Sequence, residues 1–485
     1  MRTRSGAASR GPRRLVGAAA EGSLRSVSVH FVIVGGGPAG VEAASTASRL
    51  GADVTLVESE VVGGAANLWD CIPSKAMIAT GGAITSSRRA AALGLTPARA
   101  ASDLDALRER VRSISELLAT STTRQLESQG VRLVRGRGRL VGPHRVEITP
   151  DGAVGGPGDP FVEDADAILL ATGSSPRVPD WAPVDGERVL VTRQAYPPPT
   201  IPEHLVVIGS GVTGVEFVHM FRSLGSRVTL VVSRQQVLPQ KDPEVAAALE
   251  VDFLESGVSL VKGARAVGIA REGDRVVVTC EDGRALAGSH ALLAIGSVPS
   301  SAGLGLDAAG VETNAGGYVP VNHHCQSNLA HVYAAGDLSG RLPLASVAAI
   351  QGRKVAEHVM GLHTREHRHL DYDKAASAIF TEPEIADVGL AEAEAFALGR
   401  KIRVTKVPFA LNAKAMIDGD PRGFVKLVSD PATGVVLGGS IVGAHAAELI
   451  SVIAVAVTAH LRVDDLAEAI FVHPALAEVL SAAAQ

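Results

Sequence analysis

One pattern occurs twice in this chain: a short apolar strand, a G-x-G-x-x-G turn, a helix and a second apolar strand. The first copy spans residues 30–58 and the second spans 205–231. The glycines are Gly35, Gly37 and Gly40 in the first copy and Gly209, Gly211 and Gly214 in the second. Such glycines let the backbone approach a pyrophosphate, whose charge then lies at a helix N-terminus. Two copies predict two Rossmann-type domains, each binding one dinucleotide.

The two copies differ where their second strand ends. Glu58 closes the first copy and is placed to bind the ribose hydroxyls of an ADP group. At the same offset the second copy has Val232, and Arg234 follows. The missing acid removes repulsion against a 2′-phosphate, and an arginine can attract one. We therefore expect NADPH as well as NADH to be accepted, although Arg234 could equally be a solvated loop residue.

Composition excludes several classes of protein. The chain has 46 basic and 51 acidic residues, a balance that does not indicate nucleic-acid binding. Its three cysteines are Cys71, Cys280 and Cys325. So few scattered cysteines do not indicate the disulfide framework of a secreted protein, and they favour the reducing cytoplasm. No apolar run reaches the length of roughly 20 residues that a membrane-spanning helix needs. No histidine or cysteine spacing indicates a metal site.

The first 28 residues are rich in Arg, Ser, Ala and Gly, with Glu21 as their only acid. We interpret them as a disordered extension or a start placed too early, and alternatively as a mitochondrial transit peptide. Within the body, we expect a helix over 41–50, a helix over 104–126 and short strands over 131–146. Residues 152–159 are rich in Gly and Pro and predict a hairpin loop.

Between the two copies lies the segment Gly63 to Lys75, G-G-A-A-N-L-W-D-C-I-P-S-K. Further motifs are A-T-G-S at 171–174, G-D at 336–337, F-T-E-P-E-I-A-D-V-G at 380–389 and H-P-A-L-A-E at 473–478. With both glycine fingerprints, their order resembles the flavoprotein disulfide reductases, such as dihydrolipoamide dehydrogenase, glutathione reductase and mercuric reductase. That family normally reads G-G-T-C-x-N-x-G-C-x-P-S-K.

The resemblance implies an α/β fold with two Rossmann-type domains, for FAD and NAD(P), and a C-terminal α+β dimerisation domain. The expected boundaries are an N-terminal extension at 1–28, the FAD domain at 29–188 and 305–365, the NAD(P) domain at 189–304 and the dimerisation domain at 366–485.

Residue roles follow by motif position. The implied FAD-binding residues are Gly35, Gly37, Gly40, Glu58, Gly64, Ala65, Lys75, Gly138, Thr172, Gly173, Ser174, Asp337, Leu344 and Ala345. The implied nicotinamide-dinucleotide residues are Gly209, Gly211, Gly214, Arg234, Ala266 and Gly296.

Lys75 and three further residues match catalytic positions of the family. Lys75 corresponds to the lysine near flavin N5, and Glu216 corresponds to the acidic partner that supplies the counter-charge a buried ammonium needs. The alternative interpretation of Lys75 and Glu216 is that they are surface residues on two helices. His473 and Glu478 keep the pattern in which the histidine reaches the partner subunit's site as acid or base, oriented by the glutamate. That implies a homodimer with shared sites, unless the pair survives only as interface structure. The His473–Pro474 bond is a candidate for cis geometry.

The decisive departure is at the cysteines. Cys71 matches the cysteine that lies against the flavin, where a local positive potential would stabilise a thiolate. Ala66 stands where the family has the outer cysteine. Dithiol exchange needs both sulfurs, so we expect no lipoamide or glutathione reductase activity. Cys71 is then either catalytic or only a packed thiol.

What remains is a reducible flavin that can pass electrons directly to an acceptor. The chain resembles the bacterial NAD(P)H-quinone reductases of this superfamily, and we expect a quinone as acceptor. Two alternatives stay open. One is a dihydrolipoamide dehydrogenase-like or other disulfide reductase in which Cys71 works alone, and the other is a non-catalytic flavoprotein that serves as a redox sensor.

Overall fold

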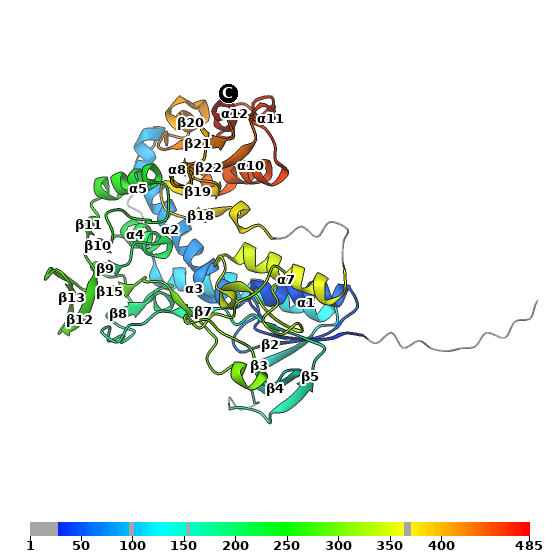
Figure 1. Ribbon diagram of the computed structural model, residues 1–485. Coiled ribbons are helices and arrows are strands. Elements are labelled where there is room, and N and C mark those ends of the chain that lie inside the picture. Colours follow the sequence, from blue (N-terminus) through cyan, green and yellow to red (C-terminus); the bar gives the residue numbers. More distant parts are fainter. Residues whose placement is uncertain (1–27, 97–100, 153–155, 363–369) are drawn as a thin grey trace, which may run out of the picture.

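The computed structural model describes residues 28–96, 101–152, 156–362 and 370–485 (Figure 1). Apart from Ser28, the N-terminal extension expected over 1–28 lies outside the described residues. So does the middle of the loop expected over 152–159.

A seven-stranded sheet forms the first unit, in the order β17-β6-β1-β2-β3-β4-β5. The strands are β1 (His30–Val34), β2 (Asp53–Glu58), β3 (Arg132–Gly142), β4 (Arg145–Pro150), β5 (Phe161–Asp164), β6 (Ala167–Leu170) and β17 (Val332–Ala334). The strands from β17 to β3 are parallel, whereas β3, β4 and β5 are antiparallel. β1 is an unbroken apolar run because its central position buries both of its faces.

Two helices lie side by side on this sheet, α1 (Pro38–Arg49) and α7 (Ala345–Val359) (Figure 1). Their backbones touch at Gly352, where a Cβ would stand 2.0 Å from the carbonyl oxygen of Ala39. This contact aligns the N-termini of the two helices near the same edge of the sheet.

The second unit holds a five-stranded parallel sheet in the order β11-β10-β9-β15-β8. Its strands are β8 (Val189–Val191), β9 (His204–Ile208), β10 (Arg227–Val232), β11 (Ser259–Lys262) and β15 (His290–Leu293), and its helices are α4 (Val212–Leu224) and α5 (Pro243–Glu255). An antiparallel sheet of β12 (Ala266–Glu272), β13 (Arg275–Cys280) and β14 (Ala285–Gly288) adjoins it. The strands β7 (Ser174–Pro176) and β16 (Ser297–Pro299) pair between the two units, and the short helix α6 (Leu306–Ala309) follows.

The C-terminal unit is an antiparallel sheet in the order β18-β19-β22-β21-β20 with helices packed on it (Figure 1). Its strands are β18 (Ser377–Ile379), β19 (Glu384–Gly389), β20 (Arg403–Pro408), β21 (Phe424–Ser429) and β22 (Val436–Gly443). Its helices are α8 (Glu392–Ala397), α9 (Ala413–Ile417), α10 (Ala446–Ala459), α11 (Val463–Ala467) and α12 (Glu478–Ala484).

Helix α2 (Ile72–Arg89) joins the units through one hydrophobic core. Its buried Met77 packs in the same cluster as Phe217 of α4 and Phe424 of β21. Helix α3 (Leu104–Ser128) packs beside it. The segment that carries Cys71 and Lys75 is therefore fixed where the three units meet.

The expected fold class is confirmed, while three local expectations need correction. The first fingerprint helix begins at Pro38 and not at residue 41, because proline is favoured in the first turn of a helix. The strands expected to be short over 131–146 are the 11-residue β3 and the beginning of β4. The helix expected over 104–126 extends to Ser128. The domain boundaries stay predictions, since sheet membership does not fix the limits.

Candidate functional site

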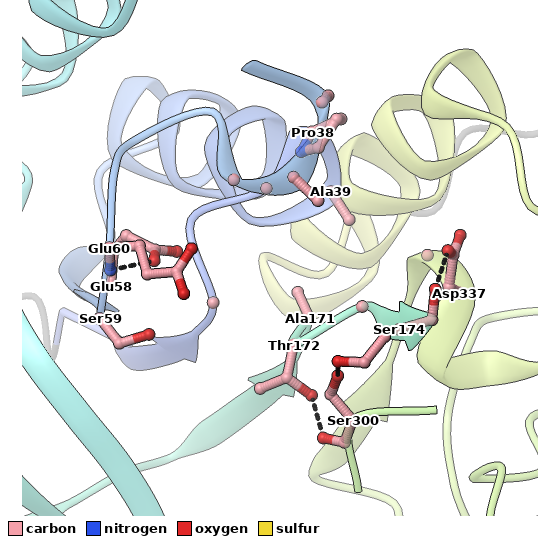
Figure 2. Close-up of a pocket in the computed structure, with 18 of the residues that line it drawn as sticks. Pro38, Ala39, Glu58, Ser59, Glu60, Ala171, Thr172, Ser174, Ser300 and Asp337 are labelled. Carbon is pink, nitrogen blue, oxygen red and sulfur yellow. Dashed lines mark hydrogen bonds between the residues drawn. The ribbon is translucent and has the colours of Figure 1, made fainter. Parts of the chain in front are cut away.

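A cavity of about 580 Å³ opens at the carboxyl ends of the first parallel sheet, the edge at which α/β folds bind ligands (Figure 2). Most residues expected to hold FAD lie in its wall. They are Gly35, Gly37, Glu58, Gly64, Ala65, Gly138, Thr172, Gly173, Ser174, Asp337, Leu344 and Ala345, and Cys71 lines it as well.

The first glycine fingerprint forms one end of this cavity. Gly35 has a φ of +106°, and a Cβ there would stand 2.3 Å from the carbonyl oxygen of Ala171. Nothing lies within 4 Å of the Cβ position of Gly37, so this residue leaves the N-terminus of α1 open. Gly40 is not a lining residue; it lets α1 approach β1, because a Cβ would stand 1.9 Å from the Gly35 oxygen. A bare helix N-terminus in a glycine cradle fits a pyrophosphate.

Glu58 ends β2 with its carboxylate at the cavity wall (Figure 2). Its Oε2 accepts a hydrogen bond from the amide of Gly36 at 2.6 Å, and its Oε1 accepts one from Glu60 at 2.7 Å. These bonds fix the orientation of the carboxylate. The carboxylate oxygens can accept hydrogen bonds from the ribose hydroxyls of an adenine dinucleotide.

A second part of the cavity wall is polar and also carries a helix N-terminus. The hydroxyl of Ser174 donates to Oδ2 of Asp337 at 2.6 Å, and that of Thr172 donates to the carbonyl of Ser300 at 2.8 Å (Figure 2). Helix α7 begins at Ala345, which lines the same space. The positive end of a helix dipole favours negative charge in a bound group. Together these features fit FAD along the whole cavity.

Lys75 and Glu216 are brought together from α2 and α4. The Lys75 Nζ lies 3.1 Å from Oε2 of Glu216, whose Oε1 accepts a hydrogen bond from the amide of Phe380 at 3.0 Å. The Nζ also lies 4.8 Å from the centre of the Phe380 ring, a cation–π contact. Glu216 is nearly buried, so the pair is no solvated surface contact.

The Cys71 thiol differs from the expectation of a stabilised thiolate. Burial raises the pKa of Cys71 above its usual value, and the Lys75 ammonium only partly opposes this. Nearby carboxylates, Asp70 first among them, raise it further. The three cysteines are free, and both Cys280 and Cys325 are buried. Ala66 lines the cavity beside Cys71 without a sulfur to offer.

The second fingerprint repeats the geometry of the first. A Cβ at Gly209 would stand 2.3 Å from the Ala294 oxygen, and one at Gly214 would stand 1.9 Å from the Gly209 oxygen. Gly211 is again free of contacts at its Cβ position. These are the same relationships as at Gly35, Gly37 and Gly40. The second unit therefore has the same cradle for a dinucleotide.

Strand register places Val232 at the position of Glu58. Val232 follows the residue paired with Ile208, as Glu58 follows the residue paired with Val34. Val232 is buried, and Arg234 is exposed in the loop after β10. Of the other expected nucleotide residues, Ala266 begins β12 and is buried, and Gly296 has a φ of +91° with open space at its Cβ position.

His473 and Glu478 also meet. His473 Nδ1 lies 2.8 Å from Oε1 of Glu478, and Oε2 accepts from the amide of Ala475 at 2.9 Å. The Ala475 amide, followed by His473, lowers the pKa of the Glu478 carboxyl. The His473–Pro474 bond is cis, as expected. The His473 side chain is 74% exposed, and it is not among the residues that line the cavity within one chain.

Sequence reasoning missed several residues of the cavity wall. Trp69 and Asp70 lie beside Cys71, and Arg193 enters from the second unit. An Nη2 of Arg193 lies 3.7 Å from Oδ2 of Asp70 and donates to the carbonyl of Ser174 at 2.6 Å. Burial raises the pKa of the Asp70 carboxyl, against the effect of Arg193. The departure of Asp70 from the family glycine was the available signal, whereas nothing in the sequence indicated Arg193.

Sequence comparison decides the family. The family described as pyridine nucleotide-disulphide oxidoreductase matches residues 29–352, and its dimerisation domain matches residues 375–484. The chain belongs to the pyridine nucleotide-disulphide oxidoreductases.

Several relatives match over nearly the whole chain. An NAD(P)H dehydrogenase (quinone) of Mycobacterium tuberculosis is 42% identical over 467 residues, which is 94% of this chain and 93% of the relative. A dihydrolipoyl dehydrogenase of Chlamydia muridarum is 33% identical over 450 residues, 92% of this chain and 94% of the relative. The crystal structure of LpdA from Mycobacterium tuberculosis matches with a TM-score of 0.88 and 41% identity, covering 94% of this chain and 99% of that one.

Membership in the pyridine nucleotide-disulphide oxidoreductases defines the general activity. The chain is an enzyme, a flavoprotein oxidoreductase whose cofactors are FAD and NAD(P)H. It carries the dimerisation domain of the family. Among the residues described here, no helix combines the length and hydrophobicity needed to cross a membrane.

Proposed function

We propose that this enzyme transfers two electrons from NAD(P)H through FAD directly to a quinone, without a redox disulfide. The observation that carries the proposal is Ala66, which lines the cavity at the position of the family's outer cysteine. The 42% identical relative is named NAD(P)H dehydrogenase (quinone), which supports the same acceptor. The reaction converts NAD(P)H, a proton and a quinone into NAD(P)⁺ and a hydroquinone, so atoms and electrons balance.

Each residue has a defined part in this proposal. When bound, FAD supplies hydride chemistry between the nicotinamide and the acceptor. Gly37 and Glu58 would hold the ADP half of FAD, and Asp337 would accept a hydrogen bond from its ribityl chain. The Lys75 ammonium, paired with Glu216, would stabilise negative charge on the reduced cofactor. Cys71 serves as a packed thiol, since its raised pKa keeps it protonated at neutral pH.

In this proposal the second nucleotide site binds NADPH as well as NADH. Val232 offers no carboxylate that would repel a 2′-phosphate, and the exposed Arg234 is available to bind one. The second cradle of Gly209, Gly211 and Gly214 would hold the pyrophosphate.

The proposed assembly is a homodimer in the cytoplasm. Ile470 is 102% exposed and Val472 is 76% exposed in the single chain, directly before His473. Apolar side chains so exposed indicate a surface that a partner covers. His473 of each subunit, oriented by Glu478, would then reach the site of the second subunit and donate a proton to the developing hydroquinone. Three unpaired cysteines suit a reducing compartment.

The test is steady-state oxidation of NADPH and NADH by the purified holoenzyme with menadione or lipoamide as acceptor. Fast turnover with menadione and none with lipoamide is the expected result. Turnover with lipoamide would contradict the proposal and favour a disulfide reductase in which Cys71 works alone, and alkylation of Cys71 would then abolish it. Failure of NADPH to reduce the flavin at all would favour a non-catalytic sensor.

A further inference from the structure

The turn that lost the outer cysteine also gained a carboxylate. Residues Ala66–Asp70 form a single π-helical turn, η1, and both of its ends line the cavity. The family has cysteine and glycine at these two positions, whereas this chain has Ala66 and Asp70. Inserted π-turns are frequent at functional sites. Both departures therefore change the same part of the wall, the part from which the family's substrate is attacked.

Asp70 has a cationic partner from another unit. Arg193 lies in η3 (Thr192–Gln194), a short turn directly after β8. Its guanidinium is held between the Asp70 carboxylate at 3.7 Å and the Ser174 carbonyl at 2.6 Å. Both bonds use the same nitrogen, Nη2. The side chain is only 25% exposed and is fixed against the cavity by these contacts.

Only Nη2 of the Arg193 guanidinium has a partner among the described residues. The buried Nε makes no hydrogen bond to any of them, and neither does Nη1. A buried donor left unsatisfied costs roughly 1–3 kcal/mol, so such groups in native proteins usually meet a ligand or water. Arg193 lines the cavity, so its guanidinium lies within reach of a molecule that enters it.

We propose that Arg193 binds a carbonyl oxygen of the electron acceptor through its guanidinium, with Asp70 as its positioning residue. The inference rests on the proposed function. The family binds its flavin with glycine at the position of Asp70, so the cofactor itself does not require the pair. A quinone, in contrast, presents carbonyl oxygens in the plane of its ring, and the planar guanidinium matches them. The cation would also stabilise negative charge on that oxygen until His473 of the second subunit protonates it and completes the hydroquinone.

The experiment compares Arg193→Gln and Asp70→Gly with the wild-type holoenzyme. The matched control is Arg177→Gln, since Arg177 is exposed, donates to the carbonyl of Ser297 and is not a lining residue. Binding of menadione to the oxidised holoenzyme is measured by equilibrium dialysis without nucleotide. Turnover is measured with menadione and with ferrocenium, a one-electron oxidant that has no oxygen atom. Flavin content and the rate of flavin reduction by NADPH are measured in parallel.

The expected result for Arg193→Gln is a loss of menadione affinity of about tenfold or more, as for removal of a charged hydrogen bond. The KM for menadione should rise by the same factor, with ferrocenium turnover, flavin content and flavin reduction unchanged. Asp70→Gly should shift the menadione KM in the same direction by less, and Arg177→Gln should change nothing. Unchanged menadione affinity in Arg193→Gln would overturn the inference, as would loss of FAD or slower flavin reduction, which would assign Arg193 to the cofactor. If the wild-type enzyme does not reduce menadione, the proposed function itself would be overturned.

Discussion

The ammonium of Lys75 lies 3.1 Å from the carboxylate of Glu216, and the amide of Phe380 donates to the other oxygen of that carboxylate. One ion pair thus ties the cavity segment to the second nucleotide unit and to the C-terminal unit. The Glu216 carboxylate supplies the counter-charge that a partly buried ammonium needs.

We expect Glu216→Gln to slow flavin reduction by NADPH by at least about tenfold, the equivalent of ~1.4 kcal/mol in activation free energy. The neutral amide keeps the size of the side chain but leaves Lys75 without its counter-charge. Stopped-flow absorbance of the flavin measures the rate. Glu250→Gln is the matched control, because the Lys262–Glu250 pair has similar exposure, 35% and 14% against 32% and 9%, and lies outside the cavity wall. Equal slowing in both variants would contradict a specific role.

Arg234 should distinguish the two nicotinamide nucleotides. We expect Arg234→Gln to raise the KM for NADPH by about tenfold and to leave the KM for NADH unchanged, because only NADPH carries the 2′-phosphate that a guanidinium binds. Steady-state kinetics with both nucleotides measure this. Arg227 is the first residue of β10, at the end of the strand opposite to the loop that carries Arg234, so Arg227→Gln is the matched control. A parallel change in both KM values for Arg234→Gln would mean that this residue does not recognise the phosphate.

Local motifs explain why much of the fold and the cofactor site could be predicted. The two glycine fingerprints each require a glycine where the backbone crosses another carbonyl, as at Gly35 and Gly209. Such constraints can be recognised within a short stretch of consecutive residues. The sequence distance from Gly40 to Glu58, applied from Gly214, also identified Val232 as the counterpart of Glu58. The strand register of the two units places Val232 at the same position.

Long-range partners could not be predicted in the same way. Arg193 meets Asp70 only because η3 and η1 pack together, and no local pattern joins residues so far apart in sequence. A local positive potential was expected to stabilise a thiolate at Cys71, yet burial raises the thiol pKa and the charge of Lys75 only partly opposes this. Desolvation depends on every neighbour at once, which a sequence does not reveal.

The thiol of Cys71 gives a pH prediction with a defined sign. Burial raises the pKa of the thiol above its usual, already alkaline value, so the thiol is protonated at neutral pH and ionises only in alkaline solution. We therefore expect no thiolate-to-flavin charge-transfer absorbance at neutral pH, and its appearance only in alkaline solution. Absorbance spectra of the oxidised holoenzyme over a pH series measure it, with Cys71→Ser as the control that lacks the band throughout. A charge-transfer band at neutral pH would show that the bound flavin lowers the thiol pKa.

Ile470 tests whether the active enzyme is a dimer. Its side chain is completely exposed in the single chain, so Ile470→Asp should change the folding stability of the monomer by no more than about 0.5 kcal/mol. In a dimer the same charge would be buried against an apolar partner surface, and the subunits should separate. Sedimentation velocity measures the association, and menadione turnover should fall with it because His473 acts in the other subunit. Val162→Asp is the matched control, at an exposed apolar residue of β5. A fully active Ile470→Asp monomer would show that His473 is not needed across the interface.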